Sequence, residues 1–353
     1  MSMSSKKKAI CQPAQNKAVV QPTKKSIESK RRIDDLNKLR ITTETEIPPT
    51  KAVISVDDVP FFEMGDIGAV KAKAKAGKTT MLKVIVAALL KKTMFRLKSE
   101  LKEPKVLWID TEQKQEDVKQ ILNDVKQLTG MDNRYIDSHL KLYSVRTLSY
   151  KTMLEDTELL ISTYRPDVVI VDGLVDFVES FNDEAQSHIL INSLIKMSDD
   201  YKCAIINVLH ENKSSEDHNM RGHLGTILSQ KAGTVLQCKK DNNDVITVSC
   251  SDSRHRAMPD WKIRYDEYGN IIDAEGKQLT RSQLEKQRRI GIMMNIIQEN
   301  GGEITRQELT SKLIESFGLN RSTVSNFITE QLKSKLCMVD DMVKIQPELD
   351  LFS

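Results

Sequence analysis

The sequence has no run of apolar residues that approaches the roughly 20 needed to cross a lipid bilayer. Its first residues, Met-Ser-Met-Ser-Ser-Lys-Lys-Lys, lack the apolar core of a secretory signal. Its few cysteines are scattered and none has C-x-x-C spacing, which argues against a zinc site or a disulfide framework. They are Cys11, Cys203, Cys238, Cys250 and Cys337. These absences predict a reduced, cytoplasmic protein without a membrane partner.

Neither sign of charge dominates the chain, because 53 basic and 50 acidic residues leave a net charge of only +3. The balance differs in residues 1–50, which hold 11 Lys or Arg and 5 Asp or Glu. A basic arm is typical of contact with nucleic acid or an acidic partner, and equally of a solvated tail. We therefore expect residues 1–48 to form a basic, largely disordered arm. The remaining length suits one large domain and one small one.

Short apolar runs alternate with helix-like stretches between residues 49 and 275. Several runs are almost continuously apolar, which is typical of strands buried on both faces. The alternation predicts an α/β domain with a mainly parallel sheet flanked by helices. The helices are expected at 79–98, 114–129, 150–164 and 184–201. The strands are expected at 67–70, 106–109, 141–145, 168–171, 204–209, 234–238, 245–249 and 261–265, the closing ones as antiparallel hairpins.

A small helical domain is predicted at 284–348, after a polar linker at 276–283. Its three helices are expected at Ser282–Asn300, Arg306–Phe317 and Arg321–Lys335, followed by a hairpin that turns at Asp340 and Asp341. This order is typical of a winged helix-turn-helix domain. Residues 281–345 hold 10 basic and 8 acidic residues, which is a weak charge for an independent DNA-binding domain. Duplex DNA and a protein partner therefore both stay open as ligands of this domain.

A phosphate-binding loop, or P-loop, of the pattern G-x-x-x-x-G-K-[ST] is recognisable, with alanine at the first glycine. It consists of Ala72, Lys73, Ala74, Lys75, Ala76, Gly77, Lys78, Thr79 and Thr80. Backbone N–H groups and a helix N-terminus hold phosphates in such loops, so these residues are candidates for binding ATP. We expect Lys78 to reach the β- and γ-phosphates and Thr79 to offer its hydroxyl to Mg²⁺. The missing glycine leaves open a protein that binds ATP but hydrolyses it poorly.

Two acidic residues at the ends of buried strands are candidates for holding the metal ion and for activating the attacking water. Asp172 ends the run Asp-Val-Val-Ile-Val-Asp, where P-loop ATPases hold Mg²⁺ through water; the alternative is an ordinary aspartate turn. Glu112 follows the strand that ends at Asp110. Because the carboxyl ends of parallel strands face the nucleotide crevice, both acids are expected near the P-loop.

With these residues in this order, the chain from about 50 to 270 resembles the RecA-like ATPases. The resemblance implies that Glu112 polarises the attacking water and that His210, after the strand at 204–209, senses the γ-phosphate. The alternatives are that Glu112 caps a helix and that His210 is a surface turn residue. It also implies that Met220–Thr226 lies toward the central channel of an oligomer, where it contacts nucleic acid or couples subunits.

Arg254 and Arg256 match the paired cation, R-x-R, of hexameric helicases that resemble DnaB and RepA. There the pair reaches into the neighbouring subunit's site; the alternative is a basic surface loop. The Leu-His-Glu-Asn-Lys and Arg-Gly-His-Leu-Gly segments look like those of RepA-like ATPases from bacterial plasmids and mobilisable elements. The resemblance implies a homo-oligomer, a hexamer, with single-stranded DNA in its channel. The expected function is a helicase or a replication or mobilisation ATPase. The alternative is a non-translocating DNA-binding regulator that uses ATP to control assembly.

Overall fold

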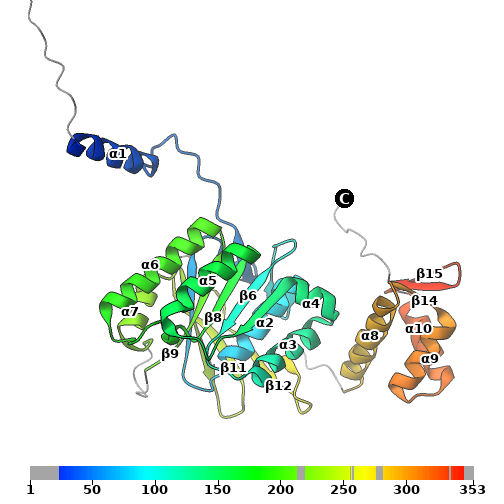
Figure 1. Ribbon diagram of the computed structural model, residues 1–353. Helices are drawn as coiled ribbons and strands as arrows, with labels where there is room; N and C mark the ends of the chain where they lie inside the picture. The colour runs from blue at the N-terminus through cyan, green and yellow to red at the C-terminus, as the bar shows by residue number, and fades with distance from the viewer. Residues whose placement is uncertain are drawn as a thin grey trace, which may run out of the picture. The chain divides into compact units, whose positions relative to one another are not determined.

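The computed structural model describes residues 24–212, 219–254, 256, 258–275, 281–333 and 335–345. The chain divides into two units, Met1–Pro49 and Thr50–Ser353 (Figure 1). The described part of the first unit holds helix α1, Lys24–Lys38, within the arm predicted at 1–48; residues 1–23 of that arm lie outside the described residues. No helix in the described ranges is both long and apolar enough to cross a membrane.

The second unit is built on a nine-stranded sheet in the order β13-β12-β11-β10-β3-β9-β8-β6-β7. All pairs from β10 to β7 are parallel, and the β10–β11, β11–β12 and β12–β13 pairs are antiparallel. The predicted mainly parallel sheet with closing hairpins is therefore confirmed. The strands are β3 (Ile67–Ala72), β6 (Val106–Asp110), β7 (Leu140–Ser144), β8 (Val168–Asp172), β9 (Ala204–His210), β10 (Thr234–Lys240), β11 (Ile246–Ser253), β12 (Trp261–Tyr265) and β13 (Ile271–Asp273).

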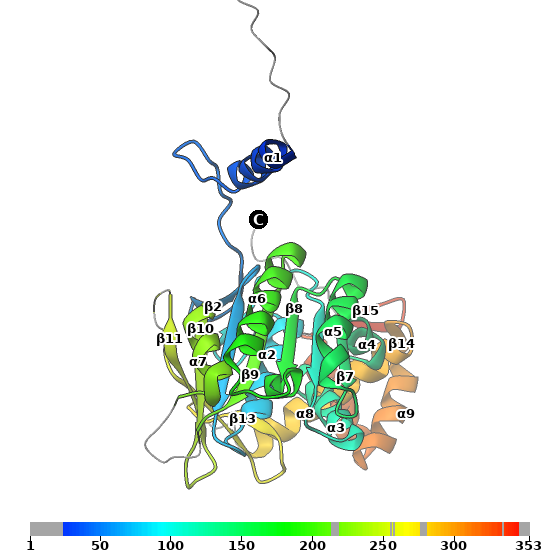
Figure 2. The same cartoon turned by 60° about the vertical axis from the view of Figure 1, so that its left-hand side comes forward.

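Helices cover both faces of this sheet, as the near-continuous apolar strands require (Figure 2). Side chains alternate along β3, so Val70 packs in the core beside α2 and Ala69 packs in the core on the other face. The first core contains residues of α2 (Lys78–Lys91), α3 (Gln115–Thr129) and α4 (Asn133–His139). The second contains residues of α5 (Tyr150–Tyr164), α6 (Glu184–Tyr201) and α7 (Gly222–Lys231).

The helix predicted over 79–98 is wrong in its last part, because α2 ends at Lys91. The backbone of Lys92 turns to φ 70°, and the chain then forms a hairpin. Its strands complete a second sheet in the order β2-β1-β5-β4. These strands are β1 (Ala52–Val56), β2 (Val59–Glu63), β4 (Thr93–Met94) and β5 (Leu97–Lys98). Burial of Met94 and Leu97 against this sheet and α2 outweighs the local helical pattern.

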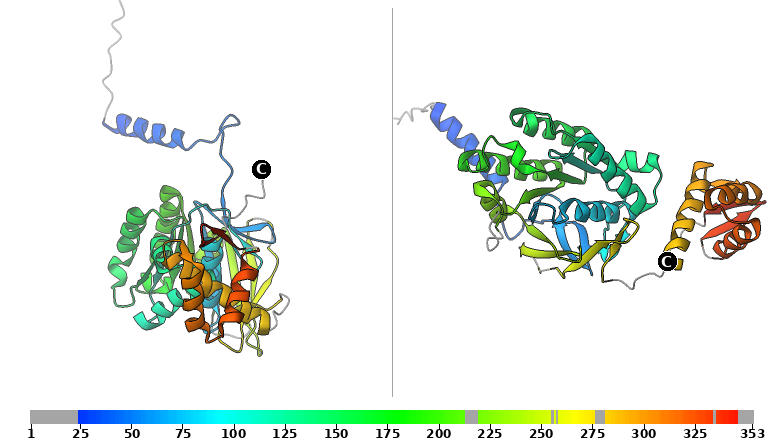
Figure 3. Two further views of the ribbon diagram at one scale, coloured as in Figure 1. Left: turned by 90° about the vertical axis from the view of Figure 1, so that its right-hand side faces the viewer. Right: turned by 90° about the horizontal axis from the view of Figure 1, so that it is seen from below.

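The carboxy-terminal residues 281–345 form three helices and a three-stranded antiparallel sheet in the order β14-β16-β15. These elements are α8 (Arg281–Glu299), β14 (Glu303–Thr305), α9 (Arg306–Phe317), α10 (Arg321–Gln331), β15 (Leu336–Val339) and β16 (Met342–Ile345). They enclose a core of their own, including Met293, Leu313 and Ile328; Figure 3 shows the yellow-to-orange helices packed with the red hairpin. The predicted helices are present, although the last ends at Gln331. Residues 276–280 of the predicted linker lie outside the described residues.

Candidate functional site

The loop between β3 and α2 leaves a row of backbone N–H groups at the start of a buried helix. Gly77 precedes α2 with φ 92°, and no side chain caps the helix. A Cβ on Gly77 would lie 2.4 Å from Ile246 Cδ1, so both the backbone angle and the space require glycine there. Lys75 also has a positive φ, 63°. The uncapped first turn of α2 is suited to an anion, because its N–H groups have no partner within the helix.

Ala72, the departure from the motif, is the last residue of β3 and pairs with His210 and Cys238 in the neighbouring strands. It is absent from the residues with positive φ, and its side chain is fully buried. The conformational freedom of glycine is therefore not needed at position 72. The position is ordinary extended backbone, which any residue can adopt.

Three predicted side chains meet at the carboxyl edge of the parallel strands. Lys78 Nζ lies 3.0 Å from His210 Nδ1, and His210 Nε2 lies 3.3 Å from Glu112 Oε1. When Lys78 donates to Nδ1 of a neutral His210, the ring proton is on Nε2 and is donated to Glu112. Burial lowers the pKa of Lys78, and the bond with His210 lowers the pKa of Glu112, which favours its carboxylate form.

Asp172, at the end of β8, is buried beside this row. Burial raises its pKa to about 7, helped by the charges of Asp110 and Glu112 and opposed by Lys78 and a hydrogen bond from Thr79. Within the described part of the chain, Asp172 Oδ2 has no hydrogen-bond partner. A buried carboxylate oxygen without a partner next to a threonine hydroxyl fits Mg²⁺, which prefers such oxygens and shares its coordination with phosphate.

The other acid of this edge, Asp110, is fully buried and already engaged. Its Oδ1 accepts the backbone N–H groups of Glu112 and Gln113, and its Oδ2 accepts the Gln113 amide at 2.6 Å. Burial raises the pKa of Asp110. Asp110 therefore shapes the turn after β6, and Glu112 is the acid of this turn that reaches the row of Lys78 and His210. Among the described side chains, no three His, Cys, Asp or Glu residues gather as a metal site of their own.

Arg254 does not reach the P-loop of its own chain. Its guanidinium donates to Lys231 O at 2.7 Å, at the carboxyl end of α7, and its N–H donates to Gly233 O. The preceding Ser253 pairs with Thr234, which pairs with Gly68 at the amino end of β3. Gly68 is four residues before Ala72, or about 13 Å along the strand. Arg254, with Arg256 two residues further, thus follows the edge of the sheet opposite Lys78.

The predicted channel segment is in part a helix. Residues 213–218 before it lie outside the described residues, and α7 begins at Gly222. The Arg221 guanidinium lies 4.4 Å from the centre of the Phe181 ring. An open hollow of about 750 Å³ is lined here by polar groups that include Asn182, His223 and Thr226.

Some residues near the P-loop have no signal in the sequence. Tyr265 OH, from β12, lies 3.0 Å from Thr80 Oγ1 and 3.2 Å from Lys83 Nζ, and Lys83 also pairs with Asp124 of α3 at 2.6 Å. Because Tyr265 is 185 residues from Thr80, only the fold brings them together. Thr111, between Asp110 and Glu112, could have been noticed from its place in the motif.

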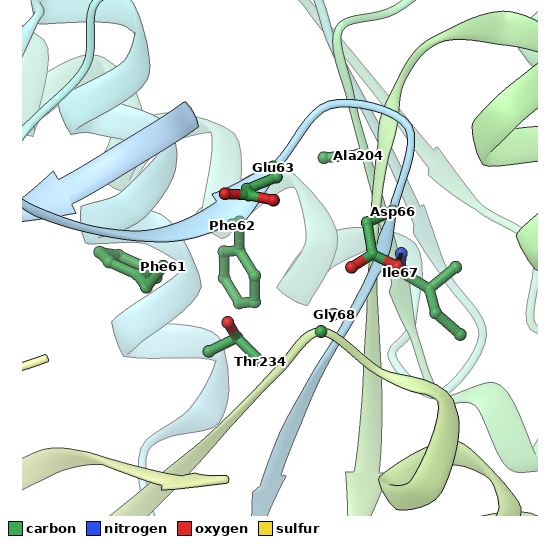
Figure 4. Close-up of a pocket in the computed structure, with 9 residues that line it drawn as sticks. Phe61, Phe62, Glu63, Asp66, Ile67, Gly68, Ala204 and Thr234 are labelled. Carbon is green, nitrogen blue, oxygen red and sulfur yellow. Dashed lines mark hydrogen bonds between the residues drawn. The ribbon is translucent and has the colours of Figure 1, made fainter. Parts of the chain in front are cut away.

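A small cavity lies at the opposite edge of the sheet, between Phe62, Asp66 and Gly68 (Figure 4). Its volume of about 10 Å³ leaves room for roughly one water molecule. The cavity is therefore too small for a nucleotide.

A family model described as AAA domain matches residues 34–216 of the chain. The solved structure of the RadB recombinase is similar, with 14% identity and a TM-score of 0.45, over 62% of this chain and 94% of that one. Another solved structure, described as an ATPase domain, is similar with 14% identity and a TM-score of 0.44, over 60% of this chain and 85% of that one. No curated protein matches the chain.

Proposed function

The chain belongs to the AAA domain family, and from this premise we propose that it binds ATP with Mg²⁺ and hydrolyses it. One observation carries the proposal: Lys78, Glu112 and Asp172 lie at one edge of the sheet, with the buried Asp172 Oδ2 lacking a hydrogen bond among the described residues. Phosphate, water and metal each have a matching group there. The nine residues from Ala72 to Thr80 form the phosphate loop of this site.

Each group has a distinct role in the proposed reaction. Lys78 binds the β- and γ-phosphates, and Thr79 and Asp172 hold Mg²⁺, the latter through water. Glu112 orients the attacking water and accepts its proton as the water oxygen bonds the γ-phosphorus and ADP leaves. His210 senses the γ-phosphate, because a phosphate that takes Lys78 competes with the bond between Lys78 and His210.

The proposed enzyme is a RecA-like homo-oligomer, a hexamer. The support is the position of Arg254 and Arg256, which follow the edge of the sheet opposite their own P-loop. Arginines placed there serve hydrolysis only if they neutralise charge in the site of a neighbouring subunit. A single subunit then has an incomplete site, and assembly controls turnover.

We place single-stranded DNA in the channel of this oligomer, as the resemblance to DnaB and RepA implies. Arg221, His223 and Thr226 line the open hollow and are suited to the phosphate backbone. The protein then acts as a helicase or as a replication or mobilisation ATPase of a bacterial plasmid or mobile element.

We propose that residues 281–345 form a winged helix domain that binds duplex DNA or a protein partner. In such domains the helix that corresponds to α10 enters the major groove. Arg321, Ser322 and Thr323 are exposed in its first turn. The hairpin between β15 and β16 turns at Asp340 and Asp341, whose carboxylates would repel a phosphate backbone. This acidic turn favours the protein partner at the hairpin.

A second candidate is a non-translocating regulator that uses ATP to control assembly on DNA. The observation in its favour is that residues 281–345 have a core separate from the two cores of the ATPase part. A unit with its own core can bind a fixed DNA site while the ATPase part switches between states.

The test is ATP binding and hydrolysis by the full chain, with and without single-stranded DNA. We expect DNA to stimulate hydrolysis, and Lys78→Ala to lower it by roughly two orders of magnitude or more. Lys91→Ala, an exposed lysine of the same helix, serves as the matched control and should leave turnover unchanged. Unaltered hydrolysis in Lys78→Ala would refute the proposed site. Displacement of a strand from a forked duplex then separates a helicase from a regulator.

A further inference from the structure

We propose that Thr111 and Asp176 are positioning residues that hold Glu112 beside Asp172. The inference rests on the proposed function, because it assigns these residues a role in the same site. They act by joining the end of β6 to the turn after β8.

Thr111 is the residue through which the two strands are joined beyond their regular pairing. Asp110 pairs with Asp172, and the backbone N–H of Thr111 continues the pairing by donating to Asp172 O at 3.0 Å. The buried Thr111 hydroxyl lies within 3.1 Å of the carbonyl oxygens of Asp172 and Gly173 and 2.6 Å from Asp176 Oδ2. A hydroxyl has one proton to donate, and the carboxylate at the shortest distance is its best acceptor.

The turn after β8 is shaped to admit this contact. Gly173 has φ 108°, and a Cβ there would lie 2.0 Å from Thr111 Oγ1 and 3.0 Å from Glu112 Cγ. The 3₁₀ helix η1, Leu174–Phe177, starts directly after this glycine and carries Asp176 back to Thr111. Glycine therefore provides the space in which the hydroxyl and the Glu112 side chain lie next to each other.

The backbone of Glu112 is consequently held by its neighbours on both sides. Thr111 is bound to β8 and η1, and Gln113 is bound by its backbone and side chain to Asp110. The Glu112 side chain itself contacts His210. Burial of the inner end of Asp176, an otherwise exposed residue, raises the pKa of its carboxyl; the hydrogen bond from Thr111 opposes this rise, and the nearby charge of Glu112 adds to it.

The first experiment compares ATP turnover in Thr111→Val, which keeps the shape of the side chain but removes its hydroxyl, with Thr111→Ser, which restores it. We expect kcat of Thr111→Val to fall roughly 10- to 100-fold with ATP affinity within about twofold, since misplacing a catalytic group by about 1 Å has effects of this size. Thr111→Ser should recover most of the activity. Thr157→Val removes an equally buried hydroxyl from α5 and should leave kcat unchanged. Equal kcat in wild type and Thr111→Val overturns the inference.

Asp176→Ala removes the acceptor from an exposed position and so tests the same contact without disturbing the core. Its kcat should fall to the same extent, and the double variant should be no worse than either single one, because both remove one contact. Additive losses would show that the two residues act separately and would overturn the inference.

A second measurement separates this inference from the proposed function. The NMR signals of the His210 ring, assigned with His210→Gln, report the placement of Glu112 without any turnover. Thr111→Val should shift them in the direction of Glu112→Gln, and Thr157→Val should not. If the wild type does not hydrolyse ATP but Thr111→Val shifts the His210 signals as expected, only the proposed function is refuted. Hydrolysis in the wild type with unmoved signals in Thr111→Val refutes the positioning role alone.

Discussion

At the scale of single residues, the site is defined by what burial does to charged groups. Asp172 is 4% exposed and its pKa is raised to about 7, mainly by burial, while Lys78 at 8% exposure has a lowered pKa. Burial makes the charged form of each group less favourable than it is in water. The site therefore stores unfavourable charge burial that an anion at Lys78 and a cation at Asp172 would relieve.

The burial of this charge predicts that Asp172→Asn raises the unfolding free energy by an amount that depends on pH. The pKa of Asp172 rises from 3.8 in the unfolded chain to about 7 in the folded protein, so stability is lost as pH increases between these values and the loss is complete above them. Asparagine carries no charge to bury. The gain in unfolding free energy of the nucleotide-free variant should be roughly 1 to 3 kcal/mol greater at pH 8 than at pH 5.

Urea unfolding of wild type and variant at the two pH values measures this gain. Asp137→Asn, at an exposed position of α4, is the control and should give the same difference from wild type at both. A gain from Asp172→Asn that does not change with pH would show that the carboxyl is ionised alike in both states. The same variant should lose affinity for ATP in the presence of Mg²⁺, because it lacks the charged oxygen that the cation needs.

At the scale of elements, the sequence predicted the strands better than the connections between them. The runs at 106–109, 168–171 and 204–209 are continuous because these strands are buried on both faces, and this signal is local. The hairpin at 93–98 and the sheet it joins were missed, because Met94 and Leu97 are buried by contacts with residues far away in the sequence. Helix propensity cannot register such contacts.

The candidate site follows the same division. Lys78, Glu112, Asp172 and His210 each stand at the end of a strand or the start of a helix, so their order along the chain predicted their convergence. The contact of Tyr265 with the first turn of α2 depends on how the antiparallel strands fold back, and no local pattern encodes that path.

The extent of β3 explains why alanine is acceptable at the start of the P-loop, and it predicts the effect of restoring glycine. Ala72 is extended, paired on both sides and buried in the core. Ala72→Gly should therefore lower the unfolding free energy by about 1 to 2 kcal/mol, through added chain freedom and the loss of a buried methyl group.

Turnover should not increase in Ala72→Gly, because the residue does not shape the phosphate-binding turn. Urea unfolding and steady-state ATP hydrolysis measure the two effects. Ala74→Gly, at an exposed position of the same loop, is the matched control and should change stability much less. Faster hydrolysis in Ala72→Gly than in wild type would mean that alanine limits the site after all.

At the scale of the whole molecule, the carboxyl and amino edges of the parallel strands carry different charged side chains. The carboxyl edge holds Lys78, the proposed phosphate-binding residue, and acidic groups, while Arg254 follows the amino edge and contacts the last turn of α7. Subunits that join one edge to the other would complete each site with a neighbour's arginines and could continue around a ring. A solitary subunit would bind ATP without efficient hydrolysis.

Mixing subunits tests this arrangement directly. Arg254→Ala/Arg256→Ala subunits keep the P-loop, and Lys78→Ala subunits keep the arginines, so each alone should be inactive. In an equal mixture that assembles at random, roughly a quarter of the interfaces join an intact P-loop to intact arginines, and a similar fraction of wild-type hydrolysis should return. Lys78→Ala/Arg254→Ala/Arg256→Ala subunits should not restore activity in either parent. Because Arg254 also binds Lys231 O, the experiment is repeated with Arg256→Ala alone, which leaves that contact in place. If the mixtures stay as inactive as their parents although mixed oligomers form, the arginines do not act across an interface.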